Sequence, residues 1–453
     1  MKRIAIFSII ILVCACTQKK EKTVKLINLD PGHFHAALVQ KQMYEEVDPE
    51  VFVYALDGPE LADYLKRVEG FNNRSDQPTS WNESVYRGDD FLEKMIEEKP
   101  GQVVVLSGNN ARKTDYILQS VEAGLNVLAD KPMVIFPGEL PKLEKAFQIA
   151  REKGVLLYDI MTERYEITTM LQRELSMISE VFGEIIPGTP DNPAITKESV
   201  HHFFKYVAGN PIVRPGWFFD VKQQGDGIVD VSTHLADLIM WETFPGRIIK
   251  KEDIDMIAAR RWTTDLVPEQ FKRVTGLEKY PGYLDQYLDE DTLKVYSNGE
   301  MVYTIKGIHA KVSVTWNYEA PEGTGDIHYS IMRGTGCELE IRQGAEENFK
   351  PMLYVVAGDD ADLQQFEAEL KQALEEKIIP AYPGVELEKL NENRWLVKVP
   401  DSYKVGHEAH FIQVTEKYLE YLHNNNLPDW EIPNMITKYY TTMIALEKAV
   451  SKK

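Results

Sequence analysis

The chain has 453 residues, which is too long for one ordinary hydrophobic core and predicts two domains. Hydrophobic residues make up 43% and charged residues 27%, the composition of a soluble folded protein. The formal net charge of −20 disfavours non-specific binding to polyanions, so we expect no nucleic-acid partner.

The first fifteen residues have the layout of an export signal. Lys2 and Arg3 precede an apolar run over residues 4–13, which is too short to span a bilayer as a mature helix. The ending Val-Cys-Ala-Cys resembles a bacterial lipoprotein signal with Cys16 as the lipidated residue; a plain secretory signal is the alternative. We therefore expect residues 1–15 to be removed and 16–23 to form a tether. A lipid anchor would then hold the protein on the periplasmic or outer face of a bacterial membrane.

Alternating apolar strands and helices over residues 24–158 predict a doubly wound parallel α/β domain. The strand at 24–29 runs into Asp-Pro-Gly-His-Phe-His, the layout that opens a dinucleotide-binding unit. The glycine pattern is degenerate, because only one of the three expected glycines is present. We expect this turn to border a pyrophosphate through the residues Gly32, His33 and Phe34.

Asp57 ends the second expected strand, 25 residues after Gly32. At about this spacing an acidic side chain accepts hydrogen bonds from the adenosine ribose, and a carboxylate there favours NAD over NADP. The alternative is that Asp57 belongs to an ordinary turn. Residues 71–90, rich in Asn, Ser, Asp and Gly, are expected to form a loop insertion.

A second chemical signal follows the expected strand at 126–129. Asp130-Lys131-Pro132 would lie at the carboxyl end of a parallel strand, where open α/β sheets bind their ligands. A lysine there can bind a substrate hydroxyl group and stabilise an alkoxide. The alternative is a surface lysine before a proline turn.

A glycine turn followed by Asp230, His234 and Asp237 is the third signal. In a helix these three residues share one face, which we expect to look into a cleft. A carboxylate one turn before a histidine can orient the imidazole and support proton transfer; a surface histidine is the alternative. The preceding segment supplies cations and rings suited to binding a sugar: His201, His202, Arg214 and Trp217.

The C-terminal half becomes rich in alternating and β-branched runs, which predict a large, mostly antiparallel open sheet in an α+β domain over 159–360. Asn298-Gly299 is expected to be a hairpin turn. Residues 361–453 are expected to be a helical extension of this domain. Apart from the expected lipidated Cys16, only Cys337 remains after processing, and no Cys/His cluster has metal-ligand spacing, so we predict neither a disulfide nor a metal site.

The glycine turn with Asp-x-x-x-His, far downstream of Asp-Lys-Pro, resembles the glucose–fructose oxidoreductase / inositol dehydrogenase family. The resemblance covers roughly residues 24–345. It implies a Rossmann domain that binds NAD, with NADP less favoured, and a homo-oligomer assembled through the second domain's sheet. The residues that it implies for the cofactor's nicotinamide side are Ser107, Asn109, Asp130 and Lys131.

This resemblance implies an NAD-dependent oxidoreductase acting on a sugar, polyol or glycoside hydroxyl group. His234 would accept the hydroxyl proton, Lys131 would hold the same oxygen, and Asp230 would orient the histidine or bind a neighbouring hydroxyl group. Two alternatives stay open: an NAD-dependent glycosidase that works by transient oxidation and elimination, and an inactive sugar-binding lipoprotein. An exported enzyme meets little free NAD, so we expect a tightly bound cofactor.

Overall fold

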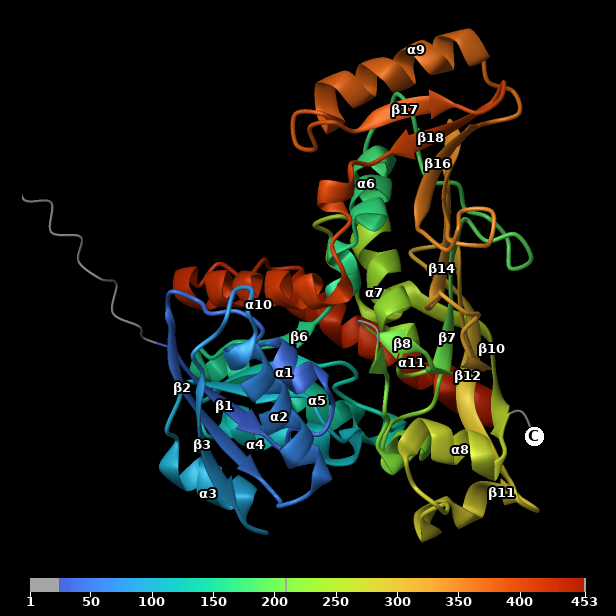
Figure 1. Cartoon of the computed structure of the whole chain (residues 1–453). Helices are drawn as coiled ribbons and strands as arrows, with labels where there is room; N and C mark the ends of the chain where they lie inside the picture. Colours follow the sequence, from blue (N-terminus) through green and yellow to red (C-terminus); the bar gives the residue numbers. More distant parts are fainter. Residues whose placement is uncertain (1–23, 208–209, 452–453) are drawn as a thin grey trace, which may run out of the picture.

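The computed structural model describes residues 24–207 and 210–451 (Figure 1). The predicted signal, tether and Cys16 therefore lie outside the described residues. In the part of the chain that is described, no helix is both long enough and apolar enough to cross a membrane.

The first domain is a parallel six-stranded sheet with the order β3-β2-β1-β4-β5-β6, which confirms the predicted Rossmann-like fold. Its strands are β1 (Val24–Leu29), β2 (Val47–Ala55), β3 (Asn82–Arg87), β4 (Val103–Leu106), β5 (Asn126–Asp130) and β6 (Leu157–Ile160). Its helices are α1 (His35–Leu38), α2 (Pro59–Asn73), α3 (Phe91–Glu98), α4 (Lys113–Glu122) and α5 (Leu140–Lys153). Strand β4 is buried along its whole length, which is why it reads as a continuous apolar run. The predicted 71–90 loop differs, since it contains the edge strand β3.

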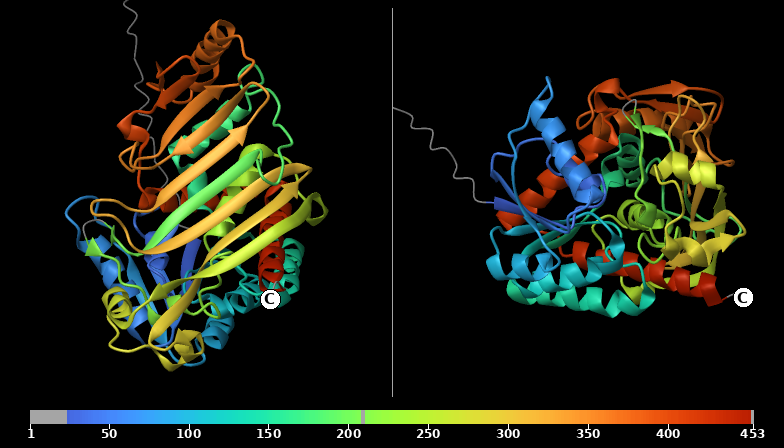
Figure 2. Two further views of the ribbon diagram at one scale, coloured as in Figure 1. Left: turned by 90° about the vertical axis from the view of Figure 1, so that its right-hand side faces the viewer. Right: turned by 60° about the horizontal axis from the view of Figure 1, so that its bottom comes forward.

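The second domain is a ten-stranded sheet, mostly antiparallel, as predicted. Its main strands are β7 (Ile195–Phe204), β10 (Ile254–Leu266), β12 (Thr292–Ile305), β13 (Ile308–Glu319), β14 (Ile327–Arg333), β15 (Cys337–Arg342), β16 (Met352–Ala357), β17 (Glu386–Lys389) and β18 (Arg394–Lys398). The short β11 (Leu288–Asp289) pairs with β12, and β7 and β13 form a parallel pair in the middle. Helices α6 (Ile167–Ser176), α7 (Ser232–Thr243) and α11 (Glu431–Ser451) cover one face, and the other face is open (Figure 2).

Asn298-Gly299 does not form the predicted hairpin turn. Both residues lie inside β12, which pairs with β10 on one side and β13 on the other. Glycine is required here for a close approach, because a Cβ at Gly299 would lie 2.5 Å from the Ile228 Cβ, and one at Gly227 would lie 1.8 Å from a β12 carbonyl oxygen. The turn over residues 225–231 can therefore sit directly on the sheet.

The C-terminal region is less uniform than the predicted helical extension. Helix α9 (Leu363–Ala373) and the β17–β18 hairpin lengthen one end of the large sheet. Helix α10 (His407–Asn424) instead lies on the first domain, and α11 crosses back to the second (Figure 1). This region therefore contacts both domains.

Buried ion pairs hold α11 in place. Lys438 has no exposed surface, and its Nζ lies 2.8 Å from Asp159 Oδ2 and 2.9 Å from Asp237 Oδ1. Asp237 also accepts two hydrogen bonds from Arg164, at 2.6 and 2.8 Å. Asp237 was predicted to face a cleft with His234, but it lies in this core network because its charge is compensated there.

Lys438→Met should lower the free energy of unfolding by about 3–5 kcal/mol, because two carboxylates would lose their shared buried cation. Denaturant unfolding followed by circular dichroism measures the change. Lys417→Met, at an exposed position of α10, is the matched control and should stay within about 0.5 kcal/mol of the parent. Equal effects of the two substitutions would show that the α11 network contributes nothing to stability.

Candidate active site

The carboxyl ends of the first domain's strands meet the 223–231 segment of the second domain in one cleft. The turn after β4 makes the contact: the Asn110 amide donates to Gln223 O at 2.8 Å, and Asn109 Nδ2 donates to Gln223 Oε1 at 2.8 Å. This is the edge at which open parallel sheets bind ligands. The predicted Asp-Lys-Pro and Asp-His signals therefore do come together.

Lys131 and Asp230 form an ion pair across this cleft. Lys131 Nζ lies 2.5 Å from Asp230 Oδ1, and the two side chains are only 12% and 8% exposed. Asp230 Oδ2 accepts a second hydrogen bond from Gln224 Nε2 at 3.0 Å. Burial alone would lower the pKa of Lys131, but the carboxylates of Asp230 and Asp130 outweigh burial and raise it. The ammonium group is therefore charged and held in one position.

Asp230 does not orient His234, although orienting this histidine was one of the two roles predicted for Asp230. Helix α7 begins only at Ser232, and the His234 amide donates to Val231 O, so the two residues are not one α-helical turn apart. The His234 ring is 8% exposed, and its Nδ1 is buried without a partner among the described residues. Burial, together with the charge of Lys131, holds the pKa of His234 well below its usual range. The imidazole is therefore neutral.

Glu163 is a carboxyl group that the sequence reasoning did not select. It lies in the short helical turn Thr162–Tyr165, immediately after β6, at the same edge of the sheet. Burial, reinforced by Glu166, raises the pKa of Glu163 to about 7, although Lys131 acts in the opposite direction. A carboxyl group that titrates near neutrality suits proton transfer. Its position after a parallel strand was the signal that could have identified it.

Asp130, the residue before Lys131, contacts a different set of side chains from Lys131. His35 Nδ1 lies 2.8 Å from Asp130 Oδ2, and Ser107 Oγ donates to the same oxygen at 2.9 Å. His33 Nδ1 is 3.8 Å from that oxygen. Burial would raise the pKa of Asp130, but its contacts with His35 and with the Lys113 ammonium hold it well below its usual range. Burial lowers the pKa of both histidines.

Two histidines and a carboxylate thus offer three potential metal ligands whose ligand atoms lie within 4.8 Å of one another: His33, His35 and Asp130. This differs from the predicted absence of a metal-ligand cluster. The sequence could not indicate it by spacing, because Asp130 follows His35 by 95 residues and the fold brings them together.

Helix α10 packs on His35 beside the site, a contact that the sequence did not predict. The rings of His407 and Phe411 lie 5.1 and 4.5 Å, centroid to centroid, from the His35 ring. Their contact with the first turn of the first domain joins segments more than 370 residues apart in the sequence. No local pattern in the sequence indicates such a contact.

The β1–α1 turn differs from a usual pyrophosphate-binding turn. The amides of Gly32 and His33 donate to Ser107 O at 3.1 and 3.2 Å, so both are already paired. A Cβ added at Gly32 would touch Trp217, Gly108 and Asn109 at 3.5–3.6 Å, so the backbone at Gly32 is covered. Helix α1 has only four residues. As folded, this turn does not fit the pyrophosphate contacts predicted for Gly32, His33 and Phe34.

The two ends of a nicotinamide dinucleotide find more suitable groups. The Asp57 side chain, just beyond the end of β2, is 82% exposed and lies 3.2 Å from Arg87 Nε. Ser107, Asn109 and Lys131 lie at the cleft edge of β4 and β5, where the nicotinamide side was expected. The residues present therefore suit the adenosine ribose and the nicotinamide of the cofactor, but not the pyrophosphate between them.

The predicted sugar-binding histidines share one carboxylate, that of Asp326. His201 Nδ1 is 2.9 Å from Asp326 Oδ2, and the buried His202 Nδ1 is 3.4 Å from Asp326 Oδ1. The His201 ring also stacks on Trp316, with centroids 5.0 Å apart. Asp326 was not predicted, since it precedes an unremarkable strand.

Arg214 and Trp217, also predicted to bind a sugar, are buried. Arg214 donates to His202 O and Phe203 O at 3.0 Å each, so two of its donors are used by the backbone. Trp217 is buried against Gly32. Arg214 therefore holds the backbone of β7, and Trp217 packs against the β1–α1 turn.

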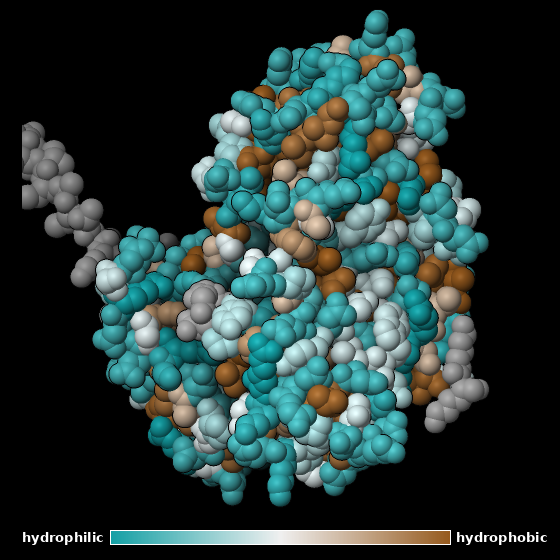
Figure 3. Space-filling model, turned by 45° about the vertical axis from the view of Figure 1, so that its right-hand side comes forward, coloured by the Kyte–Doolittle hydropathy of each residue, from teal (hydrophilic) through white to brown (hydrophobic). Residues whose placement is uncertain are grey.

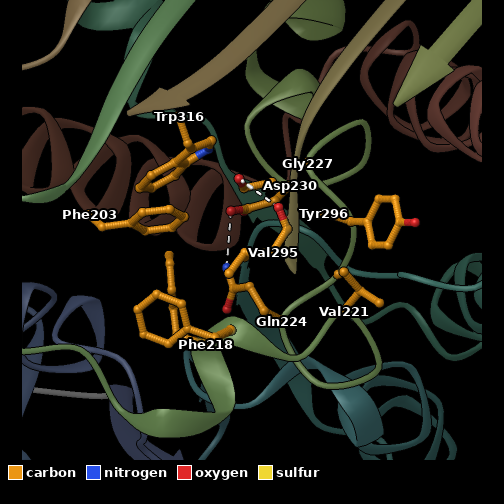
Figure 4. Close-up of a pocket in the computed structure, with 12 residues that line it drawn as sticks. Phe203, Phe218, Val221, Gln224, Gly227, Asp230, Val295, Tyr296 and Trp316 are labelled. Carbon is orange, nitrogen blue, oxygen red and sulfur yellow. Dashed lines mark hydrogen bonds between the residues drawn. The ribbon is translucent and has the colours of Figure 1, made fainter. Parts of the chain in front are cut away.

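An aromatic cavity lies beside Asp230 (Figure 4). The side chains of Phe203, Phe218 and Trp316 surround it, with Gln224 bonded to Asp230 at its base. Its free volume is about 20 Å³, little more than one water molecule fills. A sugar ring therefore does not fit inside this cavity.

Comparisons with known proteins support the same fold class. The "putative oxidoreductase C terminal domain" family model matches residues 171–450. No curated protein matches the sequence. The crystal structure of a putative oxidoreductase from Parabacteroides merdae is 55% identical, with a TM-score of 0.94, over 96% of this chain and 99% of that one.

Two more distant structures are similar in fold alone. One is levoglucosan dehydrogenase in complex with NADH and levoglucosan, at 11% identity and a TM-score of 0.59, over 95% of this chain and 97% of that one. The other is a 3-ketoreductase from Actinomadura kijaniata in complex with TDP-benzene and NADP, at 12% identity and a TM-score of 0.55, over 94% of this chain and 98% of that one.

Glu163→Gln should remove a pH dependence of folding stability. The folded-state pKa of about 7 lies above the ordinary glutamate pKa of 4.5, so the folded state holds this proton more tightly than the unfolded chain does. Stability should therefore fall as pH rises from about 4.5 to about 7. The variant, which cannot ionise, should lose that slope and be more stable than the parent above pH 7.

Denaturant unfolding at a series of pH values measures this effect. Glu93→Gln, on α3 in the first domain, is the control and should keep the parental slope. An unchanged slope in Glu163→Gln would mean that Glu163 titrates like an ordinary surface carboxyl group.

Proposed function

The chain belongs to the family of the putative oxidoreductase C-terminal domain, within the glucose–fructose oxidoreductase / inositol dehydrogenase group, and we propose that it oxidises or reduces a carbohydrate at a hydroxyl-bearing carbon with a bound nicotinamide dinucleotide. The family predicted from the Asp-Lys-Pro and Asp-x-x-x-His signals is thereby confirmed, as is its assignment to the oxidoreductases.

The observation that carries the proposal is the Lys131–Asp230 ion pair. It joins residues 99 positions apart, from two domains, at the carboxyl edge of a Rossmann sheet. A fixed ammonium group beside a carboxylate can hold a hydroxyl oxygen and stabilise the negative charge that develops when its proton leaves. Levoglucosan dehydrogenase, which is similar in fold, binds levoglucosan together with NADH, and this supports a carbohydrate substrate.

The cofactor, when bound, supplies the hydride acceptor or donor. Asp57, Ser107 and Asn109 are the residues that would hold its ends. We favour NAD, because the exposed Asp57 carboxylate would repel a 2′-phosphate. Arg87 beside Asp57 is the feature that would allow NADP instead, the cofactor that is bound in the 3-ketoreductase complex.

The chain's own groups then handle the proton. Lys131 donates a hydrogen bond to the substrate oxygen while Asp230 keeps the ammonium oriented. Neutral His234 accepts the hydroxyl proton, and Glu163 can accept or release a proton near pH 7. In the reductive direction the same groups return the proton to a keto oxygen.

Glu163 supports a second candidate function. A glycosidase that oxidises its substrate transiently must also remove a proton from carbon and protonate the departing oxygen. That chemistry needs an acid–base group besides those on the oxidised oxygen, and a carboxyl group with a pKa of about 7 beside Lys131 meets the requirement. The two functions differ in product, since only the oxidoreductase leaves a net change in the cofactor or a second substrate.

We further propose that the protein is an exported lipoprotein attached through Cys16 and that it assembles through the open sheet face. The N-terminal sequence supports the first point. The surface in Figure 3 is mostly hydrophilic with scattered hydrophobic patches, so an assembly through it would have to be partly polar. Mass spectrometry of the mature N-terminus and light scattering test the two points.

The proposed function is tested on protein purified from its native host compartment without added nucleotide. Heat-released ligand should contain close to one nicotinamide dinucleotide per chain, since an exported enzyme must retain its cofactor. Incubation with a panel of sugars and glycosides should change absorbance at the reduced-nicotinamide band. Cleaved glycoside without net reduced cofactor would identify the glycosidase, and no response to any sugar would contradict both functions.

Lys131→Met and His234→Ala should each lower kcat more than about a hundredfold on the substrate so identified, the magnitude of a lost proton-transfer or alkoxide-binding group. Lys142→Met, a partly exposed lysine of α5 paired with Asp115 of α4, is the matched control and should retain full turnover. Circular dichroism checks the fold of each variant. Parental turnover in His234→Ala would assign the proton to another residue.

A further inference from the structure

Two histidines at the β1–α1 turn meet Asp130 at the end of β5, and the proposed reaction does not use this group of side chains. We propose that His33, His35 and Asp130 bind one divalent transition-metal ion beside the Lys131–Asp230 pair. The role that we give the ion, binding an oxygen of the substrate or cofactor, rests on the proposed function. Binding of the ion depends on the three side chains alone.

The spacing of the three ligand atoms fits an ion. Metal–nitrogen and metal–oxygen bonds of about 2.0–2.2 Å place neighbouring ligand atoms roughly 3–3.5 Å apart. The His35 Nδ1–Asp130 Oδ2 and His33 Nδ1–Asp130 Oδ2 distances, 2.8 and 3.8 Å, lie on either side of that range. A small rotation of the imidazoles would therefore equalise them.

The donor set indicates the class of metal. Two imidazoles and one carboxylate suit zinc, iron(II), manganese or cobalt, and they leave coordination positions open for another ligand. A site meant for calcium or magnesium would be built from oxygen atoms. Among the described residues, this is the group of three His, Cys, Asp or Glu side chains that meets the geometric condition for an ion.

Surrounding groups orient the ligands, as they do in metal sites generally. Ser107 Oγ donates to Asp130 Oδ2, the same oxygen that meets His35, and Lys113 Nζ donates to Asp130 O at 3.0 Å. The rings of His407 and Phe411 pack on His35 and shield it. No described residue donates a hydrogen bond to Asp130 Oδ1, so one carboxylate oxygen is available.

A purely structural role explains only part of this arrangement. The His35–Asp130 hydrogen bond alone would connect the turn to β5. His33 makes no hydrogen bond to β5: its Nδ1 accepts a long 3.4 Å hydrogen bond from the His35 amide and its ring packs edge-on against the His35 ring, yet Nδ1 also lies 3.8 Å from the same carboxylate oxygen. Its placement is accounted for when it is a third ligand.

The ion would supply the positive charge that the backbone of the β1–α1 turn does not offer to an anionic ligand. The amides of Gly32 and His33 are paired with Ser107 O, so the turn has little free positive charge for an anionic oxygen. A metal ion held here would bind an oxygen ligand in its open positions. That oxygen belongs either to the substrate, next to Lys131, or to the cofactor's pyrophosphate, and the experiment below distinguishes the two sources.

The test uses the full-length mature protein, purified without a polyhistidine tag and stripped with a chelator. Titration with Co²⁺ alone, followed by visible d–d absorbance, should saturate at one ion per chain, and elemental analysis after Zn²⁺ loading should give the same count. His33→Ala should weaken Co²⁺ binding at least a hundredfold. His423→Ala, an exposed histidine near the end of α10, is the matched control and should bind as the parent does.

The oxygen source is identified by adding NAD or the active glycoside to the Co²⁺ form. A spectral change with NAD assigns the pyrophosphate, and one with the glycoside assigns the substrate; no change with either would overturn the oxygen-ligand role. No stoichiometric Co²⁺, or equal binding by parent and His33→Ala, would overturn the metal site. Nicotinamide-linked turnover is measured separately on the stripped protein, so the metal site and the proposed reaction can fail independently.

Discussion

The Lys131–Asp230 ion pair is the interaction on which the site depends. Both side chains are nearly buried, and each comes from a different domain. Either charge left alone in that position would carry a desolvation cost of several kcal/mol, which the partner at 2.5 Å offsets. Domain docking and assembly of the site are therefore one event: the same contact that compensates two charges also places the ammonium group where a substrate oxygen can reach it.

The second domain contributes this carboxylate through a backbone that only glycine permits. Gly227 and Gly299 let the 225–231 turn rest against β12, and Asp230 is then held by Gln224 on one side and Lys131 on the other. A side chain at either glycine would push the turn away from the sheet. The position of the carboxylate thus follows from steric contacts well outside the cleft.

The sequence predicted those features that depend on neighbouring residues. Apolar strands ending in polar turns predicted the parallel sheet and placed Asp130 and Lys131 at its carboxyl edge. The predicted pairing of Asp230 with His234 is wrong, because it required both residues to lie in one helix and α7 begins only at Ser232. Asp326 and His407 could not be found, since their contacts arise from packing between distant segments.

Helix α10 has a consequence for how the protein matures. His35 is made early in synthesis, whereas His407 and Phe411, which pack on its ring, are made late, at the start of α10. At a few to about twenty residues per second, the ribosome separates these events by tens of seconds. During that interval the first domain can form its sheet, but the turn above it stays exposed to solvent. Arrival of α10 covers the His35 ring, so a chain terminated before residue 407 would leave that ring exposed to solvent.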